Sequence, residues 1–281
     1  MLQKRGIRKQ TKPYLILSIF HTILIIYAFI KSKNKKQTFV LLISSIGMAY
    51  FFEFIVLNIF AAYRYKPRIF KISYHDNIFG AALSQAIFVP FTAVFMNVNK
   101  ANWKIKLLFS TYFILVERIF LSLKIFYNRW WKTRYTAIFI TIFFFLNDQW
   151  FYLLKKKNSI VQYLSLFFMT LFSVTNYSLA LTFIRKFRLG FGRFFSWKEH
   201  FAIKAFYCVL ISIPNSLFIK MNDSWRGALA AFGWSLGLDL LLVRLKLVKA
   251  HRSFYRINPI NHMVLIGMTK LFYKYIYKDL K

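Results

Sequence analysis

Four acidic side chains lie inside apolar stretches of the sequence that are long enough to cross a membrane. They are half of the eight acidic residues of the chain: Glu53, Glu117, Asp148 and Asp239. An unpaired charge inside a membrane costs roughly 2.5 kcal/mol or more, so each carboxyl group needs a partner, a proton or water. These residues predict a polar cluster within the membrane that binds a cation, a proton or a lipid headgroup.

His21 and Arg118 complete this candidate cluster. Glu117 and Arg118 are adjacent, and a helix points neighbouring side chains about 100° apart, so each must find its partner on another helix. In a purely structural alternative, Glu53 or Asp239 neutralises Arg118 while His21 hydrogen-bonds nearby, which would lock the bundle without any chemistry. The positions of these residues in the sequence leave both interpretations open.

His75 and Asp76 form a second candidate site, a possible headgroup contact near the inner membrane surface. A histidine beside an acid could perform acid-base chemistry on a lipid phosphate. The alternative that we favour is a helix cap, in which Asp76 accepts free amide hydrogens of the following turn. The remaining histidines show no metal-ligand spacing with one another or with Cys208, and no nucleotide-binding or hydrolase motif occurs. We therefore assign no catalytic residue, metal or cofactor.

The composition indicates which elements must position these side chains. The chain has 281 residues, 58% of them apolar, with a mean hydropathy of +0.45, so lipid must be the solvent for much of its surface. Backbone groups in hydrocarbon must pair internally, which makes each long apolar run a helix. We predict an all-α polytopic transmembrane bundle of about eight spans, with seven or nine left open: Tyr14 to Ile30, Gln37 to Tyr63, Asn77 to Val98, Leu107 to Leu123, Thr136 to Leu154, Ser159 to Ile184, Phe201 to Ile219 and Gly227 to Val243.

The 41 basic residues fall in bursts between these runs, as juxtamembrane loops require, and this distribution argues against a nucleic-acid partner. If the amino terminus is cytoplasmic, 28 basic residues lie on that side and 12 on the other. The bias places both termini on the cytoplasmic side of the membrane, which we expect to be a bacterial cell membrane. Anionic lipids on the cytoplasmic face are the expected partners of the basic residues. Five tryptophans at the run ends are expected at the interfaces: Trp103, Trp130, Trp131, Trp197 and Trp225.

Residues 1–256 are expected to form one transmembrane domain and residues 257–281 a cytoplasmic interfacial helix. Lysines recur at helical spacing in this tail, from Lys270 to Lys281, opposite an apolar face that includes Leu265 and Phe272. Such a helix would lie at the anionic inner leaflet. The alternative is a terminal helix packed in the bundle.

The positions of two prolines suggest an internal repeat. With four spans in each half, the third span of each half carries a proline, Pro90 or Pro214, and the fourth carries an acid, Glu117 or Asp239. Each proline removes a backbone hydrogen bond and is expected to kink its helix. A parallel four-plus-four repeat, as found in transporters, is therefore a hypothesis.

Gly233 and Gly237 form a GxxxG pattern on the eighth span. Small residues let helices approach closely, and we favour packing inside the chain. A homo-oligomer through Gly233 and Gly237 is the alternative.

The stretch from Tyr65 to Trp150 resembles a family of small, uncharacterised multi-pass membrane proteins of Bacillus and Clostridium relatives. The resemblance is carried by Tyr65-Lys66-Pro67 leading into His75-Asp76, an apolar helix near Pro90, the helix with Glu117, and Tyr127-Asn128-Arg129-Trp130. It implies a bacterial membrane location and no established activity.

Our first hypothesis is a membrane protein without enzymatic activity, whose polar centre is structural or binds a small ion or a lipid. One alternative is a secondary transporter that uses Glu53, Glu117 and Asp239. Another is a lipid-modifying enzyme that uses His75 and Asp76 at the inner leaflet.

Overall fold

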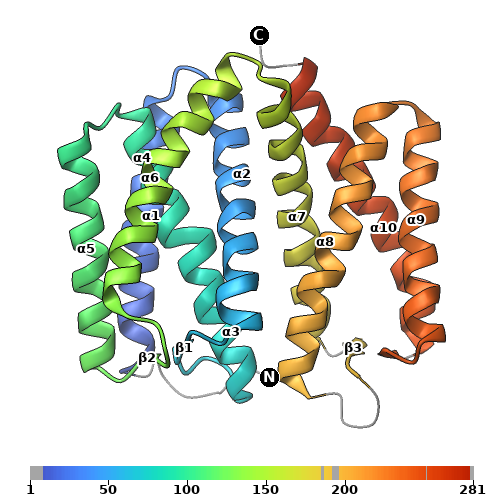
Figure 1. Cartoon of the computed structure of the whole chain (residues 1–281), viewed down its shortest axis with the longest axis horizontal. Helices are drawn as coiled ribbons and strands as arrows, with labels where there is room; N and C mark the ends of the chain where they lie inside the picture. Colours follow the sequence, from blue (N-terminus) through green and yellow to red (C-terminus); the bar gives the residue numbers. More distant parts are fainter. Residues whose placement is uncertain (1–8, 185–186, 192–195, 251, 279–281) are drawn as a thin grey trace. The chain divides into compact units, whose positions relative to one another are not determined.

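The computed structural model describes residues 9–184, 187–191, 196–250 and 252–278, and these are almost entirely helical (Figure 1). The chain divides into two compact units, residues 1–156 and 157–281. The prediction of an all-α bundle is confirmed, since the described strands are four three-residue segments.

The first unit has five helical segments and one short ribbon (Figure 1). Strands β1 and β2 pair antiparallel, with Tyr63 opposite Asn128 and Tyr65 opposite Phe126. The elements in order are α1 (Thr11–Lys31), α2 (Lys35–Glu53) with its π-helical continuation η1 (Phe54–Ile59), β1 (Tyr63–Tyr65), α3 (Ser73–Leu83), the π-helical η2 (Ser84–Phe88), α4 (Val89–Val98), α5 (Trp103–Ser122), β2 (Phe126–Asn128) and α6 (Thr133–Lys155).

The second unit has four helical segments and a ribbon of its own. Strands β3 and β4 also pair antiparallel, with Phe187 opposite Ala250 and Leu189 opposite Val248. The elements are α7 (Ser159–Phe183), β3 (Phe187–Leu189), α8 (Trp197–Met221), α9 (Trp225–Arg244), β4 (Val248–Ala250) and α10 (Arg252–Tyr273), which continues as η3 (Lys274–Lys278).

Seven of the described helical segments are long and apolar enough to cross a membrane. They comprise α1, α2 with η1, the segment from α3 to α4, and α6, α7, α8 and α9. The predicted run from Leu107 to Leu123 is helix α5, whose charged residues, including Lys106 and Arg118, keep it out of this set. Seven predicted runs thus coincide with spanning helices.

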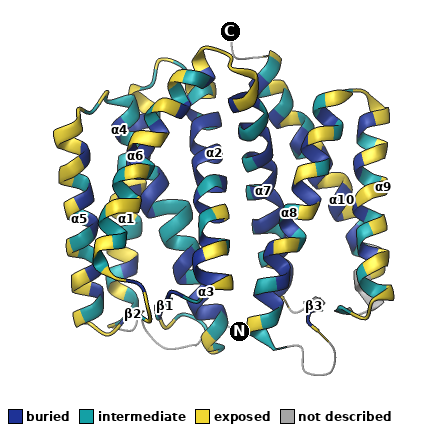
Figure 2. Ribbon diagram, viewed as in Figure 1, coloured by how far each residue is buried: buried dark blue, intermediate teal, exposed yellow. Residues whose placement is uncertain are grey.

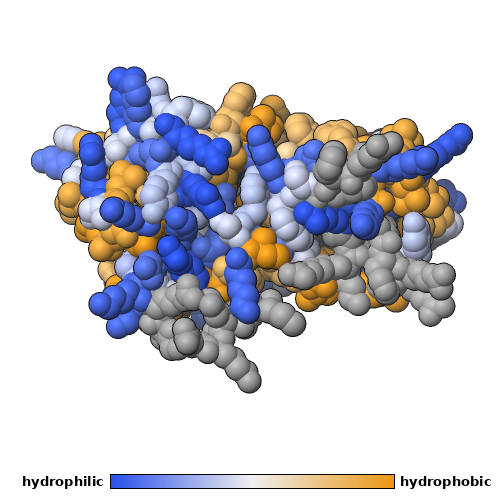
Figure 3. All heavy atoms as spheres, turned by 90° about the horizontal axis from the view of Figure 1, so that it is seen from below, coloured by the Kyte–Doolittle hydropathy of each residue, from blue (hydrophilic) through white to orange (hydrophobic). Residues whose placement is uncertain are grey.

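The outer surface of helix α1 is apolar, as lipid contact requires. Ile16, Ile23 and Ile30 are 65%, 59% and 75% exposed, while Tyr14 and His21 on the opposite face are buried (Figure 2). Lipid is a solvent for such a face, and water is not. By contrast, hydrophilic side chains gather at the end of the first unit that carries β1 and β2 (Figure 3). The chain is therefore a membrane protein built from apolar helices.

Helix α10 is amphipathic, but its polar face points inward. Asn258 and His262 are buried, while Ile260 and Met263 are 61% and 59% exposed. The helix packs against α7, α8 and α9 along its length. This arrangement matches the packed terminal helix that was the alternative from the sequence, whereas contact of the tail with lipid headgroups stays a prediction.

The two prolines act differently. Pro90 follows the π-helical segment η2, where the regular hydrogen-bond pattern is already interrupted. Pro214 lies inside α8, which continues without interruption from Trp197 to Met221. The proline thus coincides with a break in helical geometry in the first unit alone.

One packing prediction was wrong, and one of the five tryptophans expected at an interface is buried. A Cβ added to Gly233 or Gly237 would meet no atom within 4 Å, so these glycines lie on an open face and do not pack inside the chain. Trp131 is 7% exposed, because it turns inward as a wall of the cavity described below. Trp103 and Trp225 are 58% and 67% exposed, as side chains near an interface should be.

Candidate functional site

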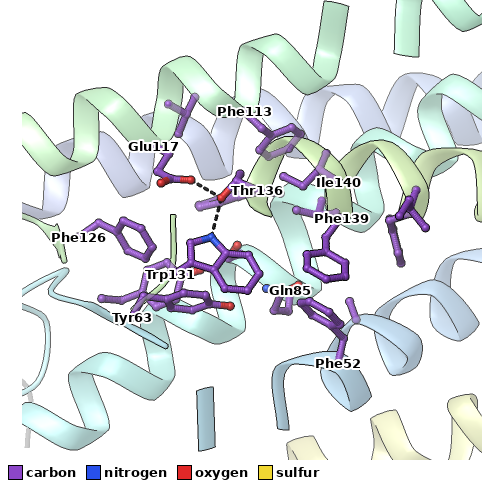
Figure 4. A pocket seen from close by; sticks show the side chains of 18 of the residues that line it. Phe52, Tyr63, Gln85, Phe113, Glu117, Phe126, Trp131, Thr136, Phe139 and Ile140 are labelled. Carbon is purple, nitrogen blue, oxygen red and sulfur yellow. Dashed lines mark hydrogen bonds between the residues drawn. The ribbon is translucent and has the colours of Figure 1, made fainter. Parts of the chain in front are cut away.

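The first unit contains a partly open cavity of about 240 Å³ between α2, η2, α5, α6 and the β1–β2 ribbon (Figure 4). Ten of its 21 lining residues are aromatic: Phe52, Tyr63, Tyr65, Phe88, Phe113, Phe120, Phe126, Trp131, Phe139 and Phe143. The polar members are few, as in most small-molecule pockets, and include Gln85, Glu117 and Thr136.

Glu117 is the carboxylate that lines this cavity. It lies on α5 and is 7% exposed. Its Oε1 accepts hydrogen bonds from Thr133 Oγ1 at 2.9 Å and from Asn128 Nδ2 at 3.2 Å, and its Oε2 accepts one from Thr136. Because β2 supplies the asparagine and α6 supplies both threonines, three consecutive elements fix the carboxylate.

The indole of Trp131 extends this network along the cavity wall. Its Nε1 donates to Thr136 Oγ1 at 2.8 Å, and Thr136 in turn donates to Glu117 (Figure 4). The indole also stacks on Phe139 at 5.7 Å and meets Tyr63 edge-on at 5.3 Å between ring centroids. The carboxylate therefore lies beside a rigid group of aromatic rings.

Glu53 is a second buried carboxylate next to the same cavity, at 5% exposure. Its Oε2 accepts hydrogen bonds from Tyr63 Oη at 2.5 Å and from Gln85 Nε2 at 3.0 Å, and both of these donors line the cavity. Glu53 directly precedes η1, and Gln85 lies in η2. Single π-helical turns are frequent at functional sites. Here one follows Glu53 directly and the other contains Gln85, its hydrogen-bond donor.

The two ribbon tyrosines, Tyr63 and Tyr65, are neutral at this site. Burial, followed by the negative charge of Glu53, raises the pKa of Tyr63 and of Tyr65 well above the ordinary value of 10.0. Each phenol therefore keeps its proton at physiological pH, and Tyr63 can donate to Glu53.

Among the residues that the structure describes, no basic side chain hydrogen-bonds to either carboxyl group of the site. Among the described residues, the groups that hydrogen-bond to Glu53 and Glu117 are hydroxyls and amides. Arg118 is exposed on α5, so the expectation that it is neutralised by Glu53 is wrong. The reason is helical geometry, since Glu117 points into the unit and its neighbour points out.

His21 is fully buried close to the cavity but does not join the carboxylates. Its Nδ1 contacts the carbonyl of Leu17 at 2.7 Å, and its ring packs among Phe88, Tyr112 and Phe113. Nε2 has no partner among the described atoms. His21 is thus a core residue of α1 behind the aromatic wall.

Asp148 belongs to a separate contact in the first unit. Its carboxylate pairs with Lys106 on α5 and accepts a hydrogen bond from Asn97 Nδ2 at 3.0 Å. Asn147, its neighbour, donates to Ser45 instead. This candidate residue therefore links α4, α5 and α6 away from the cavity.

Asp239 has its own network in the second unit. Its Oδ1 accepts a hydrogen bond from Tyr207 Oη at 2.9 Å, and its Oδ2 lies 2.8 Å from His262 Nε2 and also accepts a bond from Asn258. Asp239 does not pair with Arg118, which was one of two pairings that the sequence suggested. Its partners lie in its own unit, because α10 presents two polar side chains one turn apart on its inner face.

Asp76 has a structural role that differs from the predicted cap. Both of its oxygens accept backbone amides of the preceding loop, from Arg68 at 2.9 Å, Ile69 at 2.7 Å and Phe70 at 3.1 Å. The N-cap residue of α3 is Ile72, and no side chain caps this helix. His75 and Asp76 are each 4% exposed, so contact of this pair with a headgroup stays a prediction.

The fold and these networks define a helical-bundle membrane protein with buried carboxylates, one of which faces an aromatic cavity. The chain matches no known protein-family model, and no curated protein and no solved structure is significantly similar to it. Among the residues that the structure describes, no three histidine, cysteine or acidic side chains lie close enough to hold a metal ion.

Sequence reasoning missed the neutral partners of the carboxylates. Thr133 and Thr136 on α6, and Asn258 and His262 on α10, occur at the one-turn spacing that places both members of a pair on one helix face. This spacing is visible in the sequence. Tyr63 and Gln85 gave no such signal, because π-helical turns and a ribbon bring them to Glu53.

Proposed function

We propose that the chain is an integral membrane protein that binds a cation in the aromatic cavity of its first unit. The observation that carries this proposal is the position of Glu117, a buried carboxylate that lines the cavity and is held by neutral donors alone among the described residues. A carboxylate in a low-dielectric site is costly without a counter-charge, so a bound cation would be strongly stabilised there.

The walls of the cavity favour an organic cation over a bare metal ion. The faces of aromatic rings attract positive charge within about 6 Å of the ring centre, and the rings of Phe52, Trp131 and Phe139 line the same cavity as the carboxylate and contact one another. Hard metal ions instead require several oxygen ligands. The cavity therefore combines one negative charge with an apolar aromatic lining.

The test is equilibrium dialysis of tetraethylammonium against the detergent-solubilised protein. Wild type is expected to bind about one ion per chain, and Glu117→Gln, which keeps the shape of the side chain, at least tenfold more weakly. Asp223→Asn is the matched control, because Asp223 pairs with Lys278 at the surface of the second unit. Equal binding by wild type and Glu117→Gln, or no saturable binding by wild type, would disprove the proposal.

Secondary transport is a second candidate, favoured by the presence of two carboxylates at one cavity. Glu53 contacts the cavity through Tyr63 and Gln85, and its Oε1 has no hydrogen-bond partner among the described atoms. A proton held on Glu53 could exchange for the cation at Glu117. Uptake of tetraethylammonium into proteoliposomes under an outward proton gradient should then require both acids, whereas a binding protein shows no uptake.

We further propose a bacterial cytoplasmic membrane with the amino terminus inside and anionic lipids at the inner surface. The carboxyl terminus is not placed with it, because the described residues form nine helical segments, counting α10, and an odd number of crossings ends on the opposite side. The proposal is supported by the excess of basic residues in alternate loops and by the resemblance to proteins of Bacillus and Clostridium relatives. A green fluorescent protein fused to the amino terminus should fluoresce in cells, because it folds when it stays in the cytoplasm. A dark fusion that is nevertheless expressed would reverse the orientation.

A further inference from the structure

The two units contain the same order of elements. After α1, the first unit runs helix, strand, helix, helix, strand, helix, from α2 to α6, and the second unit runs through the same order from α7 to α10 (Figure 1). Helices α2 and α7 are the most buried candidate spans of their units, since 72% and 67% of the residues in their most apolar stretches are buried. The repeated segments therefore begin at α2 and α7, one helix later than in the four-plus-four division that the sequence suggested. In this alignment α10 is the counterpart of α6.

The first halves of the two units correspond residue by residue. Helices α2 and α7 start 124 residues apart, and each is capped by an asparagine side chain, Asn34 or Asn158. The same separation holds between the starts of β1 and β3 and between those of α3 and α8. It also relates the two helix prolines, Pro90 and Pro214.

The second halves correspond with a separation of 122 residues. Helices α5 and α9 each begin with a tryptophan, Trp103 or Trp225, and each is followed by a lysine in the left-handed region, Lys124 at φ 54° or Lys246 at φ 57°. Strands β2 and β4 start at this separation too, and the two ribbons have the same register.

A further backbone hydrogen bond beside each ribbon follows the same rule. The amide of Lys66 donates to the carbonyl of Ile125 at 2.8 Å, and the amide of Gly190 donates to that of Leu247 at 3.0 Å. Matching caps, prolines, strand register and turn conformations are independent features. Their agreement indicates two diverged copies of one module.

The carboxylate networks correspond under the same separation. Glu117 and Asp239 lie 122 residues apart, and so do Thr136 and Asn258, each of which donates to the acid of its own unit. One turn further along the helix, however, the copies differ. The first unit has Ile140, which lines the cavity (Figure 4). The second unit has His262, whose ring contacts Asp239.

We infer that the units are copies of one module and that His262 occupies, in the second copy, the place that the cationic nitrogen of a ligand takes in the first. The inference rests on the proposed cation site and names its ligand class: an imidazolium or ammonium group with a small apolar remainder. The second carboxylate has its nitrogen partner within the chain. Glu117, the first carboxylate, instead borders the cavity that Ile140 and the aromatic rings line.

The decisive variant is Ile140→His, which copies the second unit into the first. Its imidazole should contact Glu117 and compete with the ligand. In equilibrium dialysis with 1-butyl-3-methylimidazolium, we expect wild type to bind about one ion per chain and Ile140→His at least tenfold more weakly. Ile140→Leu, which keeps an apolar side chain of equal size, should bind within threefold of wild type.

The outcomes separate this inference from the proposed function. If wild type binds neither cation, the proposed function fails. If wild type binds and Ile140→His binds equally well, or if Ile140→Leu loses as much affinity, only this inference fails. Should Ile140→His not fold, His262→Ala decides: added imidazole should raise its melting temperature by more than that of wild type, because the variant has a second vacant carboxylate site. An equal rise, or no rise, overturns the inference.

Discussion

The ammonium group of Lys106 on α5 donates a hydrogen bond to the carboxylate of Asp148 on α6, and this ion pair joins two helices of the first unit. Lys106 is 5% exposed, so the ion pair is largely shielded from solvent at its lysine end. The contact shows how a predicted membrane acid can be structural while Glu117, on the same helix as Lys106, faces a cavity.

We expect Asp148→Asn to lower the free energy of unfolding by about 2 kcal/mol, because the variant leaves a buried ammonium without its counter-charge. The measurement is unfolding in mixed micelles with increasing denaturing detergent. The double variant Lys106→Met with Asp148→Asn removes both charges and should recover most of the loss. If the double variant is less stable than Asp148→Asn, the ion pair does not explain the effect.

Asp76→Asn should loosen the loop that precedes α3. Its carboxylate accepts three backbone amides, and an amide side chain can replace only part of that set, so we expect a loss of about 1.5 to 3 kcal/mol. Limited trypsin digestion should cut at Arg68 faster in the variant. The control is Lys71→Ala, an exposed change in the same segment. Unchanged cleavage at Arg68 would contradict this role.

Glycines on the two units should respond oppositely to one methyl group. A Cβ on Gly80 of α3 would clash with Cβ of Tyr65 and lie 3.3 Å from Cδ of Pro67, so Gly80→Ala should cost about 1 to 3 kcal/mol. Gly233→Ala and Gly237→Ala meet no atom within 4 Å and should raise the melting temperature slightly, since alanine favours helix. Thermal melting in detergent compares the three variants.

The open glycine face also bears on assembly. A homo-oligomer through Gly233 and Gly237 stays a prediction, and Gly233→Leu is its test. The variant should leave the melting temperature of the monomer unchanged but lower the dimer fraction in cross-linking experiments in bilayers. An unchanged dimer fraction, or no dimer in wild type, would remove this interface.

Stability should fall at alkaline pH through the ribbon tyrosines. The pKa of Tyr65 is raised well above 10.0 in the folded chain by burial, so the phenol stays protonated when the unfolded chain begins to lose that proton. Its contribution is therefore fully present below about pH 10 and is lost as the pH rises further, by up to about 1.4 kcal/mol per pH unit. Tyr65→Phe should flatten the fall of melting temperature between pH 9.5 and 11. A slope equal to that of wild type would contradict this.

The positions of the carboxylates and the helices that carry them could be predicted from the sequence. Apolar runs define helices because backbone groups in lipid must pair within the segment, and this rule placed Glu53, Glu117 and Asp239 on helices that the structure confirms. Helix α10 escaped this rule, because its buried Asn258 and His262 lower its hydropathy while its apolar residues face outward.

The sequence by itself determined that this is a multi-helix membrane protein with acids inside its helices, since hydrophobicity and charge act locally and can be read along the chain. Only the tertiary structure decided that Glu117 opens on an aromatic cavity, that Asp239 is held by His262 and that Arg118 points away. Partner choice depends on how helices rotate and pack against one another, and those rotations depend on contacts between residues that are far apart in the sequence.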